Sequence, residues 1–115
     1  MQGRRWLLSA LFAGAAAGAA LAAGSGNPMT DRLLAQPENR RIQILSAGIK
    51  GCVGTRAFLM GVTRSGPSRG TAYWSLACVD GRNLVIQISA DKKGTSFVGD
   101  CSILQGSGRS CFQKF

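Results

Sequence analysis

Residues 71–90 read TAYWSLACVDGRNLVIQISA, and this stretch decides the fold. Two strand-like runs flank Asp80-Gly81, a dipeptide that favours a β-hairpin turn. A two-residue loop pairs Val79 with Arg82 and leaves apolar and polar side chains mixed on both faces. A three-residue loop, with Gly81 left-handed in a bulge, pairs Cys78 with Arg82 and gathers the apolar side chains on one face. Since a one-residue slip moves every side chain to the opposite face, we predict the bulged register.

In the bulged register the two faces of the hairpin differ sharply in polarity. One face carries Trp74, Leu76, Cys78, Leu84, Ile86 and Ile88. The other carries Tyr73, Ser75, Ala77, Asn83, Val85 and Gln87. We therefore expect Trp74 in the core, the second face open to solvent, and Tyr73 available there as a contact residue.

The flanking segments predict two further strands and one helix. Strand patterns cover 55–62, 71–79, 82–90 and 95–101. Residues 37–48 predict a helix that begins at Pro37-Glu38, with Ile42, Leu45 and Ile49 at helical spacing to cover the Trp74 face. Residues 24–36 are expected to be a flexible lead-in, in which Thr30 caps a short turn through Leu33 and Leu34. The prediction is an α+β fold over 37–115: one amphipathic helix packed on a four-stranded antiparallel β-meander, in a single domain.

This strand order constrains the four cysteines, Cys52, Cys78, Cys101 and Cys111. Cys52 precedes the first strand and Cys78 ends the second, so in an antiparallel pair they are neighbours. Cys78 and Cys101 would be separated by a whole strand, roughly 9–10 Å, which is beyond disulfide reach. We predict the pairs Cys52–Cys78 and Cys101–Cys111, which in the chain-entropy model contribute roughly 3.5 and 2.7 kcal/mol.

Residues 1–23 have the pattern of an export signal. Arg4 and Arg5 precede an apolar run over 7–21, and a small-x-small site predicts cleavage after Ala22 or Ala23. Three interpretations remain open: a general secretory signal, a twin-arginine leader suggested by the Arg pair, or an uncleaved membrane anchor. Cysteines in an exported chain favour disulfides, so we expect a periplasmic or secreted protein.

Basic residues outnumber acidic ones but form no long run. Twelve of the fourteen Lys and Arg lie beyond residue 23, against five Asp and Glu, which is a net charge of +7 for that segment. Outside the cytosol such a charge points to anionic envelope polymers or acidic protein faces rather than to nucleic acid. Membrane contact is expected only through the leader, if it stays uncleaved. Besides Tyr73, we take Arg64, Arg69 and Arg109 as surface candidates for binding.

The chain contains no histidine, which excludes histidine-dependent nucleophiles, bases and metal sites. Its carboxylates show no paired spacing, and the cysteines have no C-x-x-C spacing. Ser89-Ala90-Asp91-Lys92 matches the S-x-x-K pattern of penicillin-binding enzymes by chance, since it straddles a strand end and the companion motifs are absent. We expect no catalytic residue, no metal and no cofactor.

Several residues of the core segment resemble a group of small, exported, disulfide-containing bacterial proteins of unknown function. The resemblance runs through Tyr73-Trp74, Cys78, Asp80-Gly81-Arg82, Gln87-Ile88, Asp100-Cys101-Ser102 and Cys111-Phe112, within residues 40–115. The order of helix and strands also resembles the PepSY-like unit of a helix and an antiparallel sheet. Neither resemblance implies a catalytic residue.

These observations predict a non-catalytic binding or accessory module of the bacterial cell envelope. Its partner is expected to be an envelope protein or an anionic envelope polymer. The alternative is an inhibitor of a cell-envelope or host hydrolase that acts through the loops 63–70 and 106–110.

Overall fold

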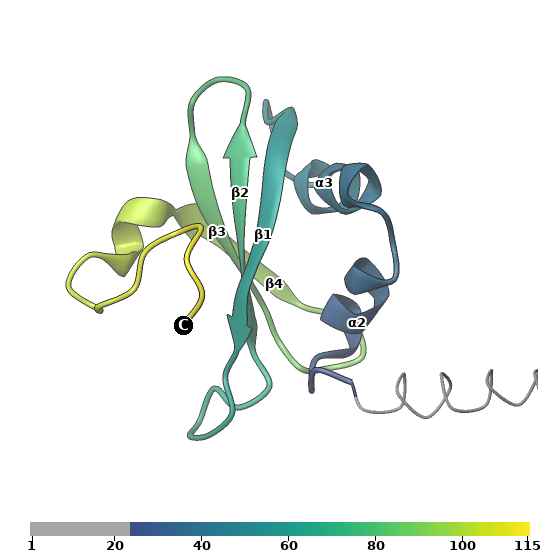
Figure 1. Ribbon diagram of the computed structural model, residues 1–115, viewed down its shortest axis with the longest axis vertical. Helices are drawn as coiled ribbons and strands as arrows, with labels where there is room; N and C mark the ends of the chain where they lie inside the picture. Colours follow the sequence, from purple (N-terminus) through teal and green to yellow (C-terminus); the bar gives the residue numbers. More distant parts are fainter. Residues whose placement is uncertain (1–23) are drawn as a thin grey trace, which may run out of the picture.

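The computed structural model describes residues 24–115, and these form two helices and one four-stranded sheet with two disulfides, an α+β fold. The predicted leader over 1–23 lies outside the described residues. The elements are α2 (Pro28–Leu34), α3 (Glu38–Ser46), β1 (Gly54–Val62), β2 (Ala72–Cys78), β3 (Asn83–Ile88), β4 (Ser96–Asp100) and the 3₁₀ helix η1 (Cys101–Leu104). The strands lie in the order β1-β2-β3-β4, and each pairs antiparallel with the next. Figure 1 shows α2 and α3 on one side of the sheet and the segment after β4 on the other.

The β2–β3 hairpin has the bulged register that its apolar face predicts. Leu76 pairs with Leu84 and Ala77 with Asn83. Cys78 N donates to Arg82 O at 2.9 Å, and Gly81 lies in the left-handed region at φ +93°. The register therefore follows from the side-chain pattern together with the one residue that tolerates that backbone conformation.

A hydrophobic core lies between the helices and the sheet. Trp74, Leu76 and Ile86 are at most 3% exposed, and Leu45 of α3 packs against the same cluster. Ile42 and Ile49 are partly buried against it. Trp74 is thus a core residue, as its place in the hairpin predicts.

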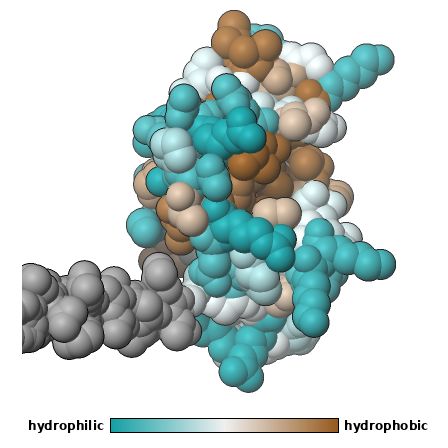
Figure 2. All heavy atoms as spheres, turned by 90° about the vertical axis from the view of Figure 1, so that its right-hand side faces the viewer, coloured by the Kyte–Doolittle hydropathy of each residue, from teal (hydrophilic) through white to brown (hydrophobic). Residues whose placement is uncertain are grey.

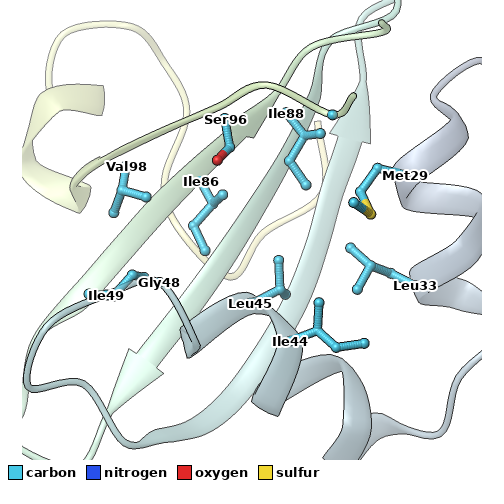
Figure 3. Close-up of a pocket in the computed structure, with 11 residues that line it drawn as sticks. Met29, Leu33, Ile44, Leu45, Gly48, Ile49, Ile86, Ile88, Ser96 and Val98 are labelled. Carbon is cyan, nitrogen blue, oxygen red and sulfur yellow. The ribbon is translucent and has the colours of Figure 1, made fainter. Parts of the chain in front are cut away.

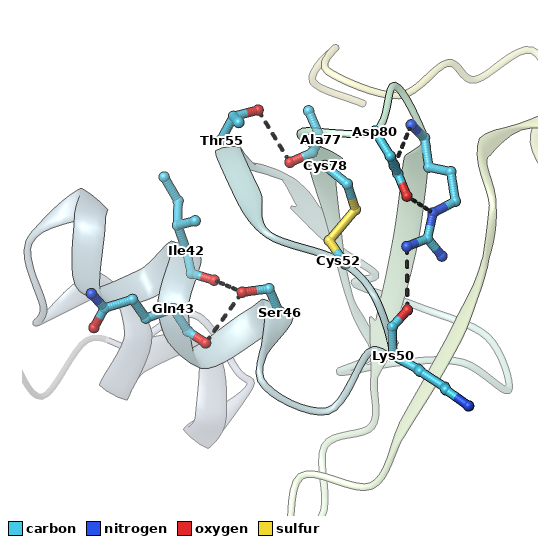
Figure 4. Close-up of a disulfide and its surroundings, with 10 residues drawn as sticks. Ile42, Gln43, Ser46, Lys50, Cys52, Thr55, Ala77, Cys78 and Asp80 are labelled. Carbon is cyan, nitrogen blue, oxygen red and sulfur yellow. Dashed lines mark hydrogen bonds and ion pairs between the residues drawn. A yellow bond between two sulfur atoms is a disulfide. The ribbon is translucent and has the colours of Figure 1, made fainter.

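The disulfide Cys52–Cys78 ties the start of β1 to the end of β2, with its Cα atoms 5.2 Å apart. Figure 4 shows how close it lies to the β2–β3 turn, where Arg82 donates to Lys50 O at 3.3 Å and pairs with Asp80. The second disulfide joins Cys101 to Cys111, with 6.0 Å between Cα atoms. Both pairs are those that the strand order predicted.

The segment 24–36 contains a helix where we expected a flexible lead-in. Asn27 caps α2, since its side chain accepts a hydrogen bond from Thr30 N, and Pro28 occupies the first turn. The cap is therefore Asn27 and not Thr30. Thr30 and Leu33 are buried, so tertiary contacts stabilise a helix that is too short to show a sequence period.

The second face of the sheet, which we expected to be open, is covered. Met60, Val85 and Leu104 form a second hydrophobic cluster, with Phe58, Tyr73 and Cys111 packed against it. Ser75 is fully buried, and its hydroxyl accepts a hydrogen bond from Phe112 N at 2.9 Å. The segment after β4 folds back over this face because the Cys101–Cys111 disulfide closes it into a loop.

None of the helices between residues 24 and 115 has the length and apolar character needed to cross a bilayer.

Candidate functional site

The four surface candidates fall into two pairs. Arg64 and Arg69 line one hollow beside the β1–β2 loop. Tyr73 and Arg109 contact the same ring, that of Phe115, at the covered face of the sheet. The structure therefore offers two places to consider, besides an apolar groove that sequence reasoning did not find.

The hollow between Arg64 and Arg69 has a volume of about 450 Å³, and we call it the arginine hollow. Its other walls include Ser25, Thr63, Gly70 and Ala90. Both arginines lie on the exposed loop that joins β1 to β2, the teal loop at the bottom of Figure 1. Val62, the last residue of β1, closes one side.

Backbone hydrogen bonds hold the loop that carries these arginines. Thr63 N donates to Thr71 O at 2.9 Å, and Gly70 N donates to Thr63 O at 2.8 Å. Within the loop, Arg69 N donates to Gly66 O at 3.1 Å. These hydrogen bonds close the loop at Thr63 and Gly70, and each arginine is the chain neighbour of one of these two residues.

Asn27 fixes the base of the arginine hollow. Its side-chain amide is fully buried and donates to Gly70 O at 2.8 Å and to Ile88 O at 2.9 Å. A third contact reaches Ser89 O at 3.1 Å. One side chain thus joins the start of α2, the β1–β2 loop and the end of β3, next to Gly26 and Gly70 of the hollow.

At the arginine hollow, one buried hydroxyl lacks a hydrogen bond and two arginines lack a carboxylate partner among the described residues. Thr63 Oγ1 is buried and has no hydrogen-bond partner in the part of the chain that the structure describes. It is the only buried side-chain oxygen or nitrogen of residues 24–115 that lacks one. Over the same residues the only ion pair joins Arg82 to Asp80, so neither Arg64 nor Arg69 has a carboxylate within 4 Å. Native proteins rarely leave buried polar atoms unpaired, and here, within the described chain, an unpaired hydroxyl and two arginines without a carboxylate contact belong to residues that line one hollow.

An apolar groove lies between the helices and the far strands of the sheet. Its floor is Ile86 and Ile88 of β3, and Val98 of β4 forms one wall. The opposite walls come from α2 and α3, with Met29, Leu33, Ile44 and Leu45 directed toward the same space in Figure 3. Figure 2 looks onto this side and shows apolar atoms at the surface between hydrophilic side chains.

The size of the apolar groove suits a side chain rather than a cofactor. Its volume is about 180 Å³, whereas sites for drug-sized ligands usually span about 300–1,000 Å³. Ile44 and Val98 are 42% and 39% exposed, so both walls keep apolar surface in contact with solvent. β4 is also an edge strand, since its only partner in the described sheet is β3.

Tyr73 and Arg109 meet around Phe115. The rings of Tyr73 and Phe115 lie 5.4 Å apart edge to face, and the Arg109 guanidinium stacks 4.1 Å from the Phe115 ring centre. Phe115 N donates to Met60 O, which anchors the tail to β1. Tyr73 is therefore partly covered by the C-terminal tail rather than lying on an open face.

Sequence reasoning gave no role to Arg56, Phe112 or Phe115, which the structure brings to this face. The Arg56 guanidinium lies 4.4 Å from the Phe112 ring centre. Phe112 has φ +64°, an uncommon backbone state for a bulky residue, and its N–H is held by Ser75. Isolated aromatics in a tail carry no periodic signal that could have indicated these contacts.

Three carboxylates are engaged in local turns. The backbone N–H of Arg82 holds the pKa of Asp80 below its usual value, and the N–H of Thr95 does the same for Asp91. The N–H of Ser102 lowers the pKa of Asp100. These groups stay ionised and fix the chain at turns, as expected for Asp in such positions.

Ser89 of the S-x-x-K match also has a local role. Its hydroxyl lies 3.1 Å from both a carboxylate oxygen of Asp91 and Thr95 O, and its one hydrogen can be donated to either acceptor. Among residues 24–115, no three His, Cys, Asp or Glu side chains gather closely enough to hold a metal ion.

Comparison of the chain with protein-family models, with curated proteins and with solved structures finds no match.

Proposed function

We propose that the chain is a non-catalytic binding or accessory module of the bacterial cell envelope, and that it holds an envelope protein through the apolar groove. The observation that carries this proposal is the groove itself, with the half-exposed Ile44 and Val98 on opposite walls. The proposal takes the sheet as a meander and α3 as its amphipathic cover. On this view the groove runs between two packed layers and keeps its shape without a partner.

The free edge of β4 supports an extended segment as the bound part of that partner. Ser96 and Val98 line the groove from β4, and the other edge of this strand has no strand beside it in the described sheet. A segment added at a sheet edge gains main-chain hydrogen bonds, while a neighbouring pocket selects its side chains. The groove would then accept one apolar side chain of the added segment.

The disulfides support the envelope as the place of action. Two disulfides indicate an oxidising compartment, which in bacteria lies outside the cytosol. We propose the periplasm or the medium, in line with the export signal expected over 1–23. The turn roles of Asp80, Asp91 and Asp100 support a binding module, because these carboxylates stabilise the fold rather than face a common substrate.

Cross-linking in the native envelope, with disulfides intact, tests the proposal. The tagged protein is compared with Val98→Asp, which places a charge in the groove, and with Val79→Asp as a matched control. Val79 is 67% exposed at the β2–β3 turn, away from the groove. We expect one dominant protein partner for the wild type and for Val79→Asp, and its loss for Val98→Asp. Recovery of monomer alone, or equal capture by Val98→Asp, contradicts the proposal.

A hydrolase inhibitor is the second candidate. The loop 63–71 projects beyond the sheet, and hydrogen bonds within the loop hold its shape. A loop that is ordered before binding loses less conformational entropy when it binds, as inhibitory loops require. Assays of envelope and host hydrolases with and without the protein test this candidate. Inhibition that Arg64→Ala or Arg69→Ala abolishes would favour the inhibitor over the accessory module.

A further inference from the structure

We propose that the arginine hollow is a binding site for a phosphate group. The site lies apart from the apolar groove, since the two share no lining residue, and it does not depend on the protein partner proposed above. It uses the guanidinium groups of Arg64 and Arg69 with the hydroxyl of Thr63. Ser25 at the rim adds a second hydroxyl side chain.

The charge balance of the arginine hollow favours an anion. Arg64 and Arg69 belong to one loop, line the same hollow and have no carboxylate within 4 Å in residues 24–115. The carboxylates of the neighbouring segments are engaged by backbone N–H groups, Asp31 by Ser25 N at 2.9 Å at the rim of the hollow and Asp91 by Thr95 N at 3.1 Å. An anion bound in the hollow would gain charge-assisted hydrogen bonds from the guanidinium groups.

The hydroxyl of Thr63 is a neutral donor that an anion in the hollow could engage. Its Oγ1 is buried without a partner, and Thr63 itself lines the hollow. A buried hydroxyl without a hydrogen bond is costly, so a rotation of the side chain that turns the hydroxyl toward a bound anion would be favoured. A tetrahedral phosphate has enough oxygens to engage two guanidinium groups and a hydroxyl together, whereas a carboxylate has two.

The position of the site admits two sources of phosphate. Ser25 and Gly26 line the hollow, so the segment predicted as the leader joins the described chain at its rim. A phospholipid headgroup at the membrane surface and a soluble phosphate compound would present the same group there. The chemistry is shared, and the experiment separates the sources.

The test titrates the exported protein, with both disulfides intact, with inorganic phosphate and follows backbone amide NMR shifts. We expect saturable shifts over residues 63–71. Arg64→Gln/Arg69→Gln should weaken binding at least tenfold. Arg32→Gln/Arg40→Gln removes the same charge from exposed positions of α2 and α3 and should leave binding within twofold. Absence of saturable shifts over 63–71, or equal weakening by both double variants, overturns the proposal.

The variant Thr63→Val provides a second test, in which loss of folding cannot explain a loss of phosphate affinity. Removing an unpaired buried hydroxyl should leave the thermal midpoint unchanged or raise it, yet weaken phosphate binding at least threefold. Unchanged phosphate affinity in a folded Thr63→Val variant would contradict the role given to the hydroxyl.

Vesicle co-sedimentation then separates the sources. Wild-type binding to phosphatidylglycerol vesicles that Arg64→Gln/Arg69→Gln abolishes, but Arg32→Gln/Arg40→Gln retains, assigns the site to a lipid headgroup. Phosphate binding without vesicle binding assigns it to a soluble phosphate compound. Val98 does not line this hollow. The phosphate site and the protein partner proposed above can therefore be disproved independently of each other.

Discussion

The indole of Trp74 donates a hydrogen bond to the hydroxyl of Thr30 at 3.0 Å, across 44 residues of chain. Both side chains are at most 1% exposed. The bond joins α2 to β2 in the middle of the core, where an unpaired indole N–H would be costly. It explains why a seven-residue helix has a fixed place on the sheet.

Replacing Thr30 tests this bond. Thr30→Val keeps the shape of the side chain but leaves the Trp74 N–H without its acceptor, and we expect a loss of about 1–3 kcal/mol in the free energy of unfolding. Thr30→Ser keeps an oxygen and should recover much of that loss. Urea unfolding followed by tryptophan fluorescence measures both variants. A Thr30→Val variant as stable as the wild type contradicts the account.

Asn27 has an even larger structural role. Asn27→Ala removes the α2 cap and leaves the carbonyls of Gly70, Ile88 and Ser89 without that donor. We expect a loss on the order of 3 kcal/mol, since each buried group left unpaired costs about 1–3 kcal/mol. Asn39→Ala, at an exposed position of α3, is the control and should change stability by less than about 0.5 kcal/mol.

Gly70 is required at the base of the arginine hollow for two separable reasons. Its φ is +86°, and an added Cβ would lie 2.7 Å from the Ala90 Cβ. Gly66 has a similar φ of +80° but open space around it. Gly66→Ala should therefore cost about 1–2 kcal/mol from backbone strain alone. Gly70→Ala should cost about 1–3 kcal/mol more from the clash. Equal costs in thermal unfolding would contradict the packing described.

The lowered pKa values of Asp80, Asp91 and Asp100 predict that the folded state loses stability at acid pH. A carboxylate whose pKa is lower in the folded state stabilises that state above its unfolded pKa. The stabilisation is lost as the pH falls through the folded pKa. We expect the free energy of unfolding to fall below the usual pKa of Asp, and Asp91→Asn to flatten that decline. An unchanged slope in Asp91→Asn would argue against the turn role of this residue.

Some of this architecture could be predicted from the sequence because local patterns determine it. Gly81 and the apolar set around Trp74 leave one hairpin register, and the antiparallel pairing of β1 with β2 places Cys52 beside Cys78. The strand limits then follow within one or two residues. Here turn chemistry and side-chain alternation agree, so no knowledge of distant contacts is needed.

The remaining features depend on contacts between distant segments. Nothing local shows that Thr30 meets Trp74, so α2 could not be told from a flexible segment. Phe112 and Phe115 are isolated apolar residues in a polar tail, so the covering of the second face could not be foreseen. Arg64 and Arg69 were expected as surface residues of one loop, but their hollow also has walls from Ser25 and Ala90, which only distant contacts bring to that loop.

The most direct test of the central claim places a photo-reactive amino acid at Val98, with Val79 as the control position. The protein is illuminated in its own envelope, and cross-linked products are identified by mass spectrometry. The account predicts one dominant envelope protein linked from Val98 and not from Val79, with the linked residue in an extended apolar segment of that protein. No product from Val98, or the same products from both positions, would contradict a binding role for the apolar groove.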